Sequence, residues 1–518
     1  MRTINSLFRY FVILIFSGLV IAVFTSCEKP AVDELDFQES VLNEDEIPWQ
    51  DLLTQLDLES NILFVQAGES IQDVVDSAKP GDVIYVEPGN YQESVSIKNQ
   101  DIKVVGLSLE PDDLMIEYAE KNNIEIIKLY EDGDYLQNRS LNRPGKNILR
   151  LMKRTSLGNG IAHYQFEIVM GPGEFNVIRL HRVVRERRPY RPVYTRGNVF
   201  MVHGAIQDFD DIFLTAGAET INAETSSPFY LASNNIDVWG IDMGWTMVPL
   251  QNRDFSFMEG WGMEKDISHT LTAMSLARLI RGLTYQGFSR MNLLGFSYGV
   301  HVAYGAANRE TQQHRFWRDV KGIIPVDSAL KYEDENAMAN SCAAAAFHMD
   351  HINIGLYNHP WGVDFIKWGK LALKAPDGKS PDFPGTNSQF LMFVGSQGFF
   401  AADENGAYLY SDPLRFFRLA VNLSPHWPRQ LVYELTASSC PKEDVTYDDH
   451  LGEISIPILY IGAEMAEGSA GIYTSSLTAS TDITNYIVPG YSHADLWFAY
   501  DADEMVWSPL CNWLKNHK

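Results

Sequence analysis

From residue 164 to the C-terminus, short apolar segments alternate with segments of helical periodicity. Residues 199–202, 236–242, 290–294 and 322–326 are mainly apolar or small. Near-continuous apolar strands of this kind are buried on both faces, as in parallel sheets whose crossover connections are helices. The sequence therefore predicts an α/β fold with a doubly wound, mostly parallel sheet and helices on both of its faces.

The start of this sheet is predicted to be a hairpin. Two strand-like segments, residues 164–169 and 176–180, flank Gly171-Pro172-Gly173. The chain has 518 residues, which is more than one average domain needs. We expect one large α/β domain over residues 131–518, with an inserted helical lid at about 331–450.

The N-terminus resembles a bacterial lipoprotein signal peptide over residues 1–26. Arg2 and Arg9 precede an apolar run over residues 10–24, and small polar residues then lead to Cys27. In such signals the cysteine becomes the acylated first residue of the mature chain, which implies an exported protein anchored by lipid to the bacterial cell envelope. Phe24 departs from the usual leucine, so a plain secretory peptide and an uncleaved anchor remain as alternatives.

Two further segments precede the α/β domain. Residues 27–59 are acidic and lack a sustained apolar period, which is typical of a tether. Residues 60–130 contain short β-rich runs and one helix, and residues 67–97 resemble the cap and first rungs of pectin-lyase-like parallel β-helices. This unit is too short for a lyase groove, because solenoids need several stacked rungs. It either packs on the larger domain or binds glycan.

The net charge of the chain is strongly negative. With 67 acidic and 41 basic residues, the formal charge is −26. Such a field repels phosphate polymers, so nucleic acid is not expected as a partner.

A turn rich in glycine follows the predicted strand at 290–294. It reads Gly295-Phe296-Ser297-Tyr298-Gly299, and a helix is predicted over residues 300–308. Glycines permit a sharp turn between strand and helix, which lifts the serine oxygen above the sheet at a helix N-terminus. Ser297 is therefore the candidate nucleophile.

A serine hydroxyl needs a general base, and that base in turn needs an acid to orient it. His493 follows the last predicted strand and is the candidate base, whereas His269 and His301 lie on helices and are expected to be packing residues. Two places are open for the acid. Asp327 directly follows the strand at 322–326, and Glu464, or less favourably Glu467, follows the strand at 456–462.

Backbone amides near Ser297 complete the predicted site. The strand at 199–202 leads into His203-Gly204-Ala205, where the amide of Ala205 is a candidate oxyanion donor together with the amide of Tyr298. The imidazole of His203 is expected to shape this turn, and Asp242 is expected to brace loops. No metal-binding spacing and no phosphate loop appears, so neither a metal nor a cofactor is expected.

These features resemble α/β hydrolases of the acid-lipase and esterase type. The likeness runs from about Tyr164 to the C-terminus and rests on residues 203–204, 230–232 and 237–240, on the Ser297 turn and on His493. It implies hydrolysis of carboxylic esters, often lipids, through an acyl-enzyme. Two alternatives remain: an esterase acting on plant polysaccharide, suggested by the β-helix-like unit, and a surface binding protein on a hydrolase scaffold.

The insertion at 331–450 is rich in aromatic residues, which would form either its own small core or an apolar acyl pocket. It also holds Cys342 and Cys440. We expect these two cysteines to pair, because an exported chain meets oxidising conditions, although buried free thiols are the alternative.

Overall fold

A computed structural model describes residues 62–65, 70–79, 82–86, 95–96, 103–106 and 148–517. The predicted signal peptide, the acylation site Cys27 and the acidic tether lie outside the described residues. Within them, no helix combines the length and the apolar character that a bilayer crossing requires.

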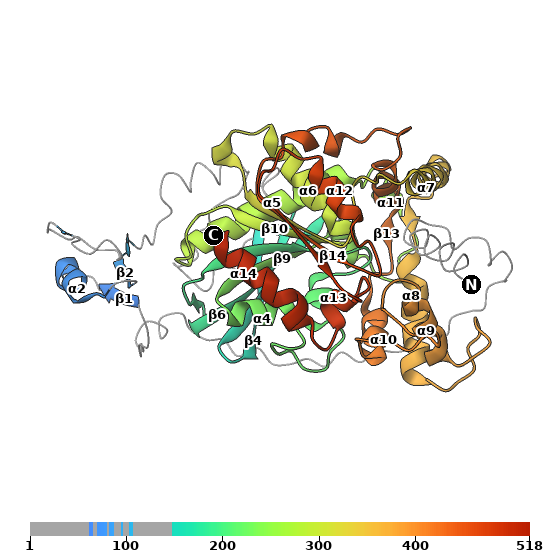
Figure 1. The fold of residues 1–518 in the computed structure, drawn as a ribbon, viewed down its shortest axis with the longest axis horizontal. Coiled ribbons are helices and arrows are strands. Elements are labelled where there is room, and N and C mark those ends of the chain that lie inside the picture. Colours follow the sequence, from blue (N-terminus) through green and yellow to red (C-terminus); the bar gives the residue numbers. More distant parts are fainter. Residues whose placement is uncertain are drawn as a thin grey trace.

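One large mixed sheet forms the centre of the protein (Figure 1). Its strand order is β15-β14-β11-β10-β8-β9-β6-β5-β4, and β7 pairs with β6. The six strands from β15 to β9 run parallel, and β6, β5 and β4 continue the sheet in antiparallel fashion. The strands are β4 (Ile148–Gly158), β5 (Ile161–Val169), β6 (Val177–Arg188), β7 (Arg191–Pro192), β8 (Gly197–Val202), β9 (Ile236–Asp242), β10 (Met291–Phe296), β11 (Val320–Val326), β14 (Ile458–Ala463) and β15 (Ile483–Val488).

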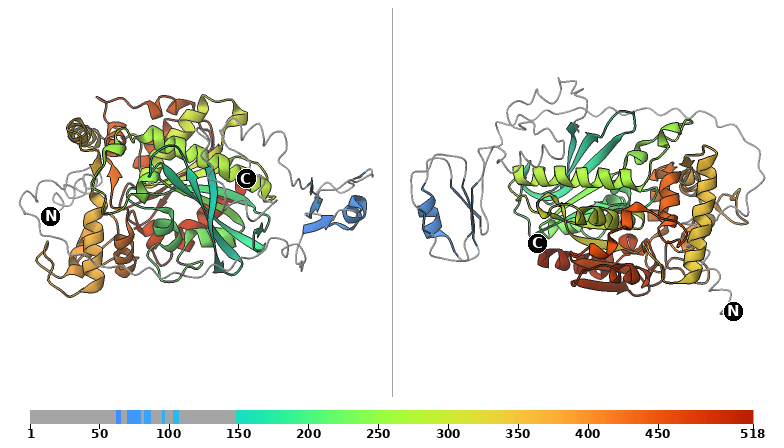
Figure 2. Two further views of the ribbon diagram at one scale, coloured as in Figure 1. Left: turned by 180° about the vertical axis from the view of Figure 1, so that it is seen from behind. Right: turned by 90° about the horizontal axis from the view of Figure 1, so that it is seen from above.

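The central strands are buried along their whole length, which accounts for their apolar sequences. Every residue of β8, β9, β10 and β14 is buried. Helices cover both faces, with α5 and α6 on one side and α4 and α14 on the other (Figures 1 and 2). These helices and their neighbours are α4 (Ser227–Ser233), α5 (Met263–Leu283), α6 (Tyr298–Thr311), α12 (Ala470–Ser476), α13 (Asp495–Phe498) and α14 (Ser508–Asn516). The predicted doubly wound, mostly parallel α/β fold is confirmed.

The segment between β11 and β14 is mainly helical. It contains α7 (Glu335–Asn353), β12 (Asn358–His359), α8 (Trp361–Lys374), α9 (Asn387–Ser396), α10 (Pro413–Asn422), β13 (Trp427–Pro428) and α11 (Arg429–Ala437). Helices α8, α9 and α10 pack together, and α7 packs against α11. The residues predicted as an inserted lid, about 331–450, fall in this segment, and the assignment of a lid stays a prediction.

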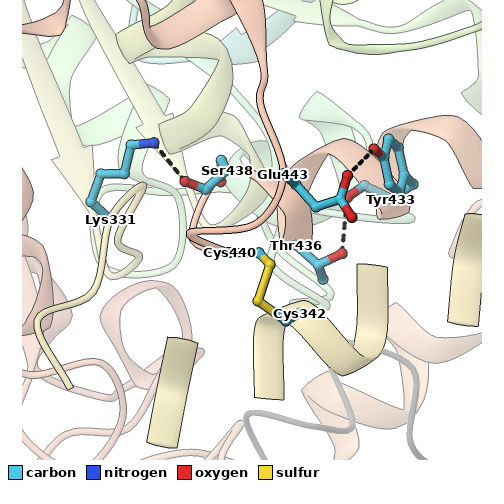
Figure 3. The surroundings of a disulfide bond; sticks show 7 residues. All are labelled: Lys331, Cys342, Tyr433, Thr436, Ser438, Cys440 and Glu443. Atoms are coloured by element: carbon cyan, nitrogen blue, oxygen red, sulfur yellow. Dashed lines mark hydrogen bonds between the residues drawn. A yellow bond between two sulfur atoms is a disulfide. The ribbon is translucent and has the colours of Figure 1, made fainter. Parts of the chain in front are cut away.

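A disulfide joins two ends of the insertion (Figure 3). Cys342 on α7 pairs with Cys440, which follows α11 and is 98 residues further along the chain. The expected pairing is therefore confirmed. Beside it, Lys331 Nζ donates to the carbonyl of Ser438 at 2.6 Å. Cys511 is a buried free thiol.

Within its described residues, the N-terminal β-rich unit contains three short parallel strands and a helix. The strands are β1 (Ile62–Val65), β2 (Val83–Val86) and β3 (Lys103–Gly106), and the helix is α2 (Ile71–Ser77). Ser70 caps α2 by accepting from the amide of Asp73, as helix N-caps do. The resemblance of this unit to a β-helix cap stays a prediction.

The predicted hairpin is confirmed as β5 and β6, with Val169 opposite Val177, but the sheet begins one strand earlier, at β4. Strand β4 was missed. Its sequence contains Arg150, Lys153 and Arg154, which interrupt an apolar pattern. Charged residues are typical of edge strands, and β4 is the edge of this sheet.

Candidate active site

Ser297 occupies a strained turn between β10 and α6. Its backbone angles are φ 55° and ψ −119°, a conformation that residues other than glycine rarely adopt. A Cβ atom on Gly295 would lie 2.0 Å from the carbonyl oxygen of Gly299, and a Cβ on Gly299 would lie 2.4 Å from that of Val202. Both glycines are therefore required by close backbone contacts, and the turn presents Ser297 at the first turn of a helix.

Asp327 and His493 meet next to this turn. Asp327 follows β11 and is fully buried, with φ 50°. Its Oδ2 lies 2.6 Å from Nδ1 of His493, and its Oδ1 accepts a hydrogen bond from the amide of Ala463 at 2.7 Å. A carboxylate held in this way fixes the orientation of the imidazole, and it stabilises the cation that forms when the imidazole takes a proton.

The two alternative acids lie elsewhere. Glu464 is exposed and accepts a hydrogen bond from the amide of Gly490 at 2.7 Å. Glu467 accepts from the hydroxyl of Tyr332 at 3.1 Å, and burial together with the nearby Asp327 carboxylate raises its pKa to about 8. Of the three candidate acids, Asp327 is the one in contact with His493.

Ser297 and His493 line one pocket, together with the predicted oxyanion residue Ala205. The ring of Phe296 stacks on His493 with a centroid distance of 4.6 Å. The remaining walls are mainly apolar and come from the oxyanion loop, the insertion and the histidine loop: Ile206, Gln207, Trp361, Phe365, Phe399, Phe416, Leu419, Leu423 and Ala494. Aromatic residues of the insertion thus line the pocket as well as the core of the insertion itself.

Tyr298 begins α6, so its amide is one of those that have no partner within the helix. Its side chain is anchored below the turn, because its hydroxyl donates to Oδ2 of Asp266 at 2.5 Å. Asp266 also accepts from the indole of Trp245 at 2.9 Å. Asp266 is buried, and burial raises its pKa to about 6.

The loop after β8 carries the other predicted oxyanion donor. The amide of Gly204 donates to Oε1 of Gln207 at 3.2 Å, within the turn that presents Ala205. The imidazole of His203 is fully buried, with Nδ1 2.8 Å from the carbonyl oxygen of Gly204, and it packs edge-on against Trp245. Its expected role in shaping the turn agrees with these contacts.

The other candidates from the sequence are buried in the body of the domain. His301 lies 3.4 Å from the hydroxyl of Tyr447, and burial lowers its pKa to about 3. Burial likewise lowers the pKa of His269 to about 3. Asp242 accepts from the amide of Phe209 at 2.9 Å, so it braces the loop after β8 as expected.

Asp495 holds the histidine loop in place and was not found from the sequence. Its buried carboxylate accepts from the amides of Ser492 and Ala401 at 3.0 and 2.8 Å, and from the hydroxyl of Ser411 at 2.6 Å. Ala401 and Ser411 belong to the insertion, so this contact joins the insertion to the loop of His493. No motif marks Asp495, because its partners in the insertion, Ala401 and Ser411, are 94 and 84 residues away in the chain.

One group of side chains among the described residues has the composition and spacing of a metal site: His163, His181 and Asp210. It lies outside the pocket that Ser297 and His493 line.

No protein-family model matches the sequence, and no curated protein matches it. Among solved structures, a "putative lipase" from Sulfolobus solfataricus matches with a TM-score of 0.54 and 19% identity, covering 72% of this chain and 99% of the other. A monoglyceride lipase from Saccharomyces cerevisiae matches more loosely, with a TM-score of 0.36 and 12% identity over 74% of this chain and 97% of the other. Together with the strand order and the serine turn, the first likeness shows that this chain has the α/β-hydrolase fold.

Proposed function

We propose that the protein is a serine hydrolase that cleaves carboxylic esters of the lipase or esterase type. The observation that carries the proposal is the contact between His493 and the buried Asp327 at 2.6 Å, in a pocket that Ser297 also lines. Nucleophile, acid and base follow one another in the chain order of α/β hydrolases, and each comes after a different strand.

The proposed reaction has two steps. His493 removes the hydroxyl proton of Ser297 as its oxygen attacks the ester carbonyl, and the amides of Ala205 and Tyr298 hold the resulting oxyanion. The protonated imidazole then gives its proton to the departing alcohol. The acyl group remains covalently bound to Ser297 as an acyl-enzyme. Water, deprotonated by His493, attacks this acyl-enzyme, and the imidazolium returns its proton to Oγ of Ser297 as the acid is released.

The walls of the pocket favour an apolar acyl or aryl group. Trp361, Phe365, Phe399 and Phe416 surround the space beside Ser297 with aromatic surface. Burying apolar substrate surface contributes roughly 25 cal/mol per Å² before the costs of binding. We therefore expect uncharged esters of apolar acids to be better substrates than esters of small polar acids.

The test uses the purified full chain and p-nitrophenyl esters of increasing acyl length. Hydrolysis with a chain-length optimum, lost in Ser297→Ala, is the expected result. Ser256 is an exposed serine outside the pocket, and Ser256→Ala is the matched control that should retain the wild-type rate. Folded protein without esterase activity would instead favour a binding protein on a hydrolase scaffold.

A polysaccharide esterase remains the second candidate from the sequence. It predicts faster hydrolysis of acetylated or feruloylated glycans than of free p-nitrophenyl esters, which a direct comparison of kcat/KM would reveal.

We further propose that the protein is exported and held at the bacterial cell envelope through an acylated Cys27. The disulfide between Cys342 and Cys440 supports export, since disulfides persist in oxidising compartments. The acylated N-terminus would then bind the membrane. The expected substrate is a small-molecule, lipid or glycan ester.

A further inference from the structure

Two neighbouring strands and the loop after β8 bring three metal-ligating side chains together. His163 lies on β5 and His181 on β6, and in the antiparallel register His163 is opposite Val183 while His181 is opposite Gln165. Residues two apart on a strand share a face, so both histidines project from the same face of the sheet. Asp210 begins η4 (Asp210–Thr215), the π-helix that follows the oxyanion loop.

The three ligand atoms form a compact triangle. Nε2 of His163 lies 3.0 Å from Nδ1 of His181, and Oδ1 of Asp210 lies 3.6 Å from each of these nitrogens. Tetrahedral zinc, with bonds of about 2.0 to 2.2 Å to nitrogen and oxygen, places its ligand atoms about 3.3 Å apart. We propose that His163, His181 and Asp210 bind a divalent transition metal ion, with Zn²⁺ as the best fit to this donor set.

The surroundings have the further contacts that metal sites use to orient their ligands. The other ring nitrogen of His181 lies 2.9 Å from Oδ2 of Asp242, a carboxylate–histidine pair of the kind that supports zinc ligands. Oδ2 of Asp210 accepts a hydrogen bond from Nε2 of the Gln165 side chain at 2.9 Å, which leaves Oδ1 facing the two imidazoles.

A hydrogen-bonded chain without metal explains only part of this arrangement. Nε2 of His163 could donate to Nδ1 of His181, whose other nitrogen lies 2.9 Å from Oδ2 of Asp242. That chain leaves Oδ1 of Asp210 buried with no hydrogen-bond donor in the described part of the protein. A buried carboxylate oxygen without a hydrogen-bond donor is costly, whereas a cation among the three atoms would satisfy it.

The partly exposed side chain of Asp210 gives the ion a route to the site. His163 and His181 are 5% and 0% exposed, but the side chain of Asp210 is 35% exposed. A fourth ligand from water would complete the tetrahedron on the side of Asp210. Imidazole and carboxylate donors suit zinc, whereas Ca²⁺ and Mg²⁺ prefer oxygen ligands alone.

The position suggests what the ion would do. Phe209 lies between Asp210 and the oxyanion loop, its ring packs on His181 with a centroid distance of 4.7 Å, and its amide donates to Asp242. A metal bound at Asp210 would therefore tie the loop that carries Ala205 to β5 and β6. Its role is to stabilise and position that loop, because the ion lies outside the pocket of Ser297.

The test measures Zn²⁺ binding to the full chain after treatment with a chelator. We expect about one tightly bound Zn²⁺ per chain, by titration and elemental analysis, a thermal midpoint that rises with Zn²⁺, and the visible absorption of tetrahedral Co²⁺ after substitution. His163→Gln and Asp210→Asn should both lose the ion. Asp242→Asn should weaken binding roughly 10- to 100-fold, the usual effect of removing an outer partner.

Two controls distinguish this site from other histidines. His269→Gln removes a buried histidine on α5 and should bind Zn²⁺ like the wild type. His450→Asn removes the exposed pair of His450 and Glu453, which is a plausible place for adventitious zinc. The proposal is overturned if the folded wild type binds no Zn²⁺, if His450→Asn removes it, or if Asp210→Asn binds as tightly as the wild type. Because the side chain of Asp210 is partly exposed, Asp210→Asn is expected to fold even if His163→Gln does not.

Discussion

At the scale of single residues, the carboxylate of Asp327 links the end of a central strand to the imidazole of His493. The carboxylate contacts both Nδ1 of His493 and the backbone amide of Ala463. Asp327→Asn keeps the shape of the side chain, but its NH₂ group must then face one of these two hydrogen-bond donors. In a triad this substitution selects the wrong imidazole tautomer and lowers kcat by about 10⁴-fold. We expect a loss of about 10²- to 10⁴-fold with p-nitrophenyl esters.

The rejected acids provide matched controls for that measurement. Glu464→Gln and Glu467→Gln alter carboxylates that bind Gly490 and Tyr332, and each should change kcat less than tenfold by the usual size of distant effects. A larger loss in Glu464→Gln than in Asp327→Asn would transfer the role of the acid to Glu464.

A second prediction at this scale concerns Asp266 and pH. Burial raises the folded-state pKa of Asp266 to about 6, above its unfolded value, so the folded state binds the proton more tightly between about pH 4 and 6. The contribution of this group to the free energy of unfolding is full below about pH 4 and is lost as pH rises through 6. Asp266→Asn imitates the protonated form of the side chain, so its contribution to the free energy of unfolding should not vary with pH.

The measurement is urea unfolding of wild type and Asp266→Asn at several pH values. The free energy of unfolding of the wild type minus that of the variant should fall by about 2 kcal/mol between pH 4 and 7. Taking the difference cancels the titration of other groups. A difference that does not vary with pH would contradict the assignment.

At the scale of elements, helix α10 forms one wall of the pocket, and we expect it to limit the length of the acyl group. Leu419 is 4% exposed and lines the pocket, whereas Leu414 on the same helix is 46% exposed and lies away from it. Leu419→Ala enlarges the pocket and should shift the ester optimum by roughly two carbons towards longer chains, since each buried CH₂ contributes about 0.8 kcal/mol. Leu414→Ala should leave the optimum unchanged. An identical profile for both variants would mean that α10 does not contact the acyl group.

At the scale of the whole molecule, the fold was largely predictable, because its central strands are buried on both faces and therefore have continuous apolar sequences. Ser297 and His493 could be selected because the turn and the last strand leave local signals. The choice between Asp327 and Glu464 could not be made, because it depends on which strand end lies beside His493. The contacts of Asp495 and the cluster of His163, His181 and Asp210 join segments far apart in the chain, so no spacing revealed them.

The predicted membrane anchor also belongs to this scale. Cys27→Ala should move the protein from the membrane fraction to the soluble fraction of the cell envelope, because acylation would be lost while export continues. Fractionation followed by detection of the chain measures this. The matched change Cys511→Ser alters a buried thiol within the α/β domain and should not change the partition. A Cys27→Ala protein that stays in the membrane would contradict acylation and favour an uncleaved anchor.

The most direct test of the central claim is to label the purified protein with a fluorophosphonate and to locate the adduct by mass spectrometry of its peptides. The account predicts a single modified residue, Ser297, with labelling lost in Ser297→Ala and strongly slowed in His493→Ala. Labelling at another serine, or no labelling of a folded protein that binds esters, would contradict the assignment of this chain as a serine hydrolase.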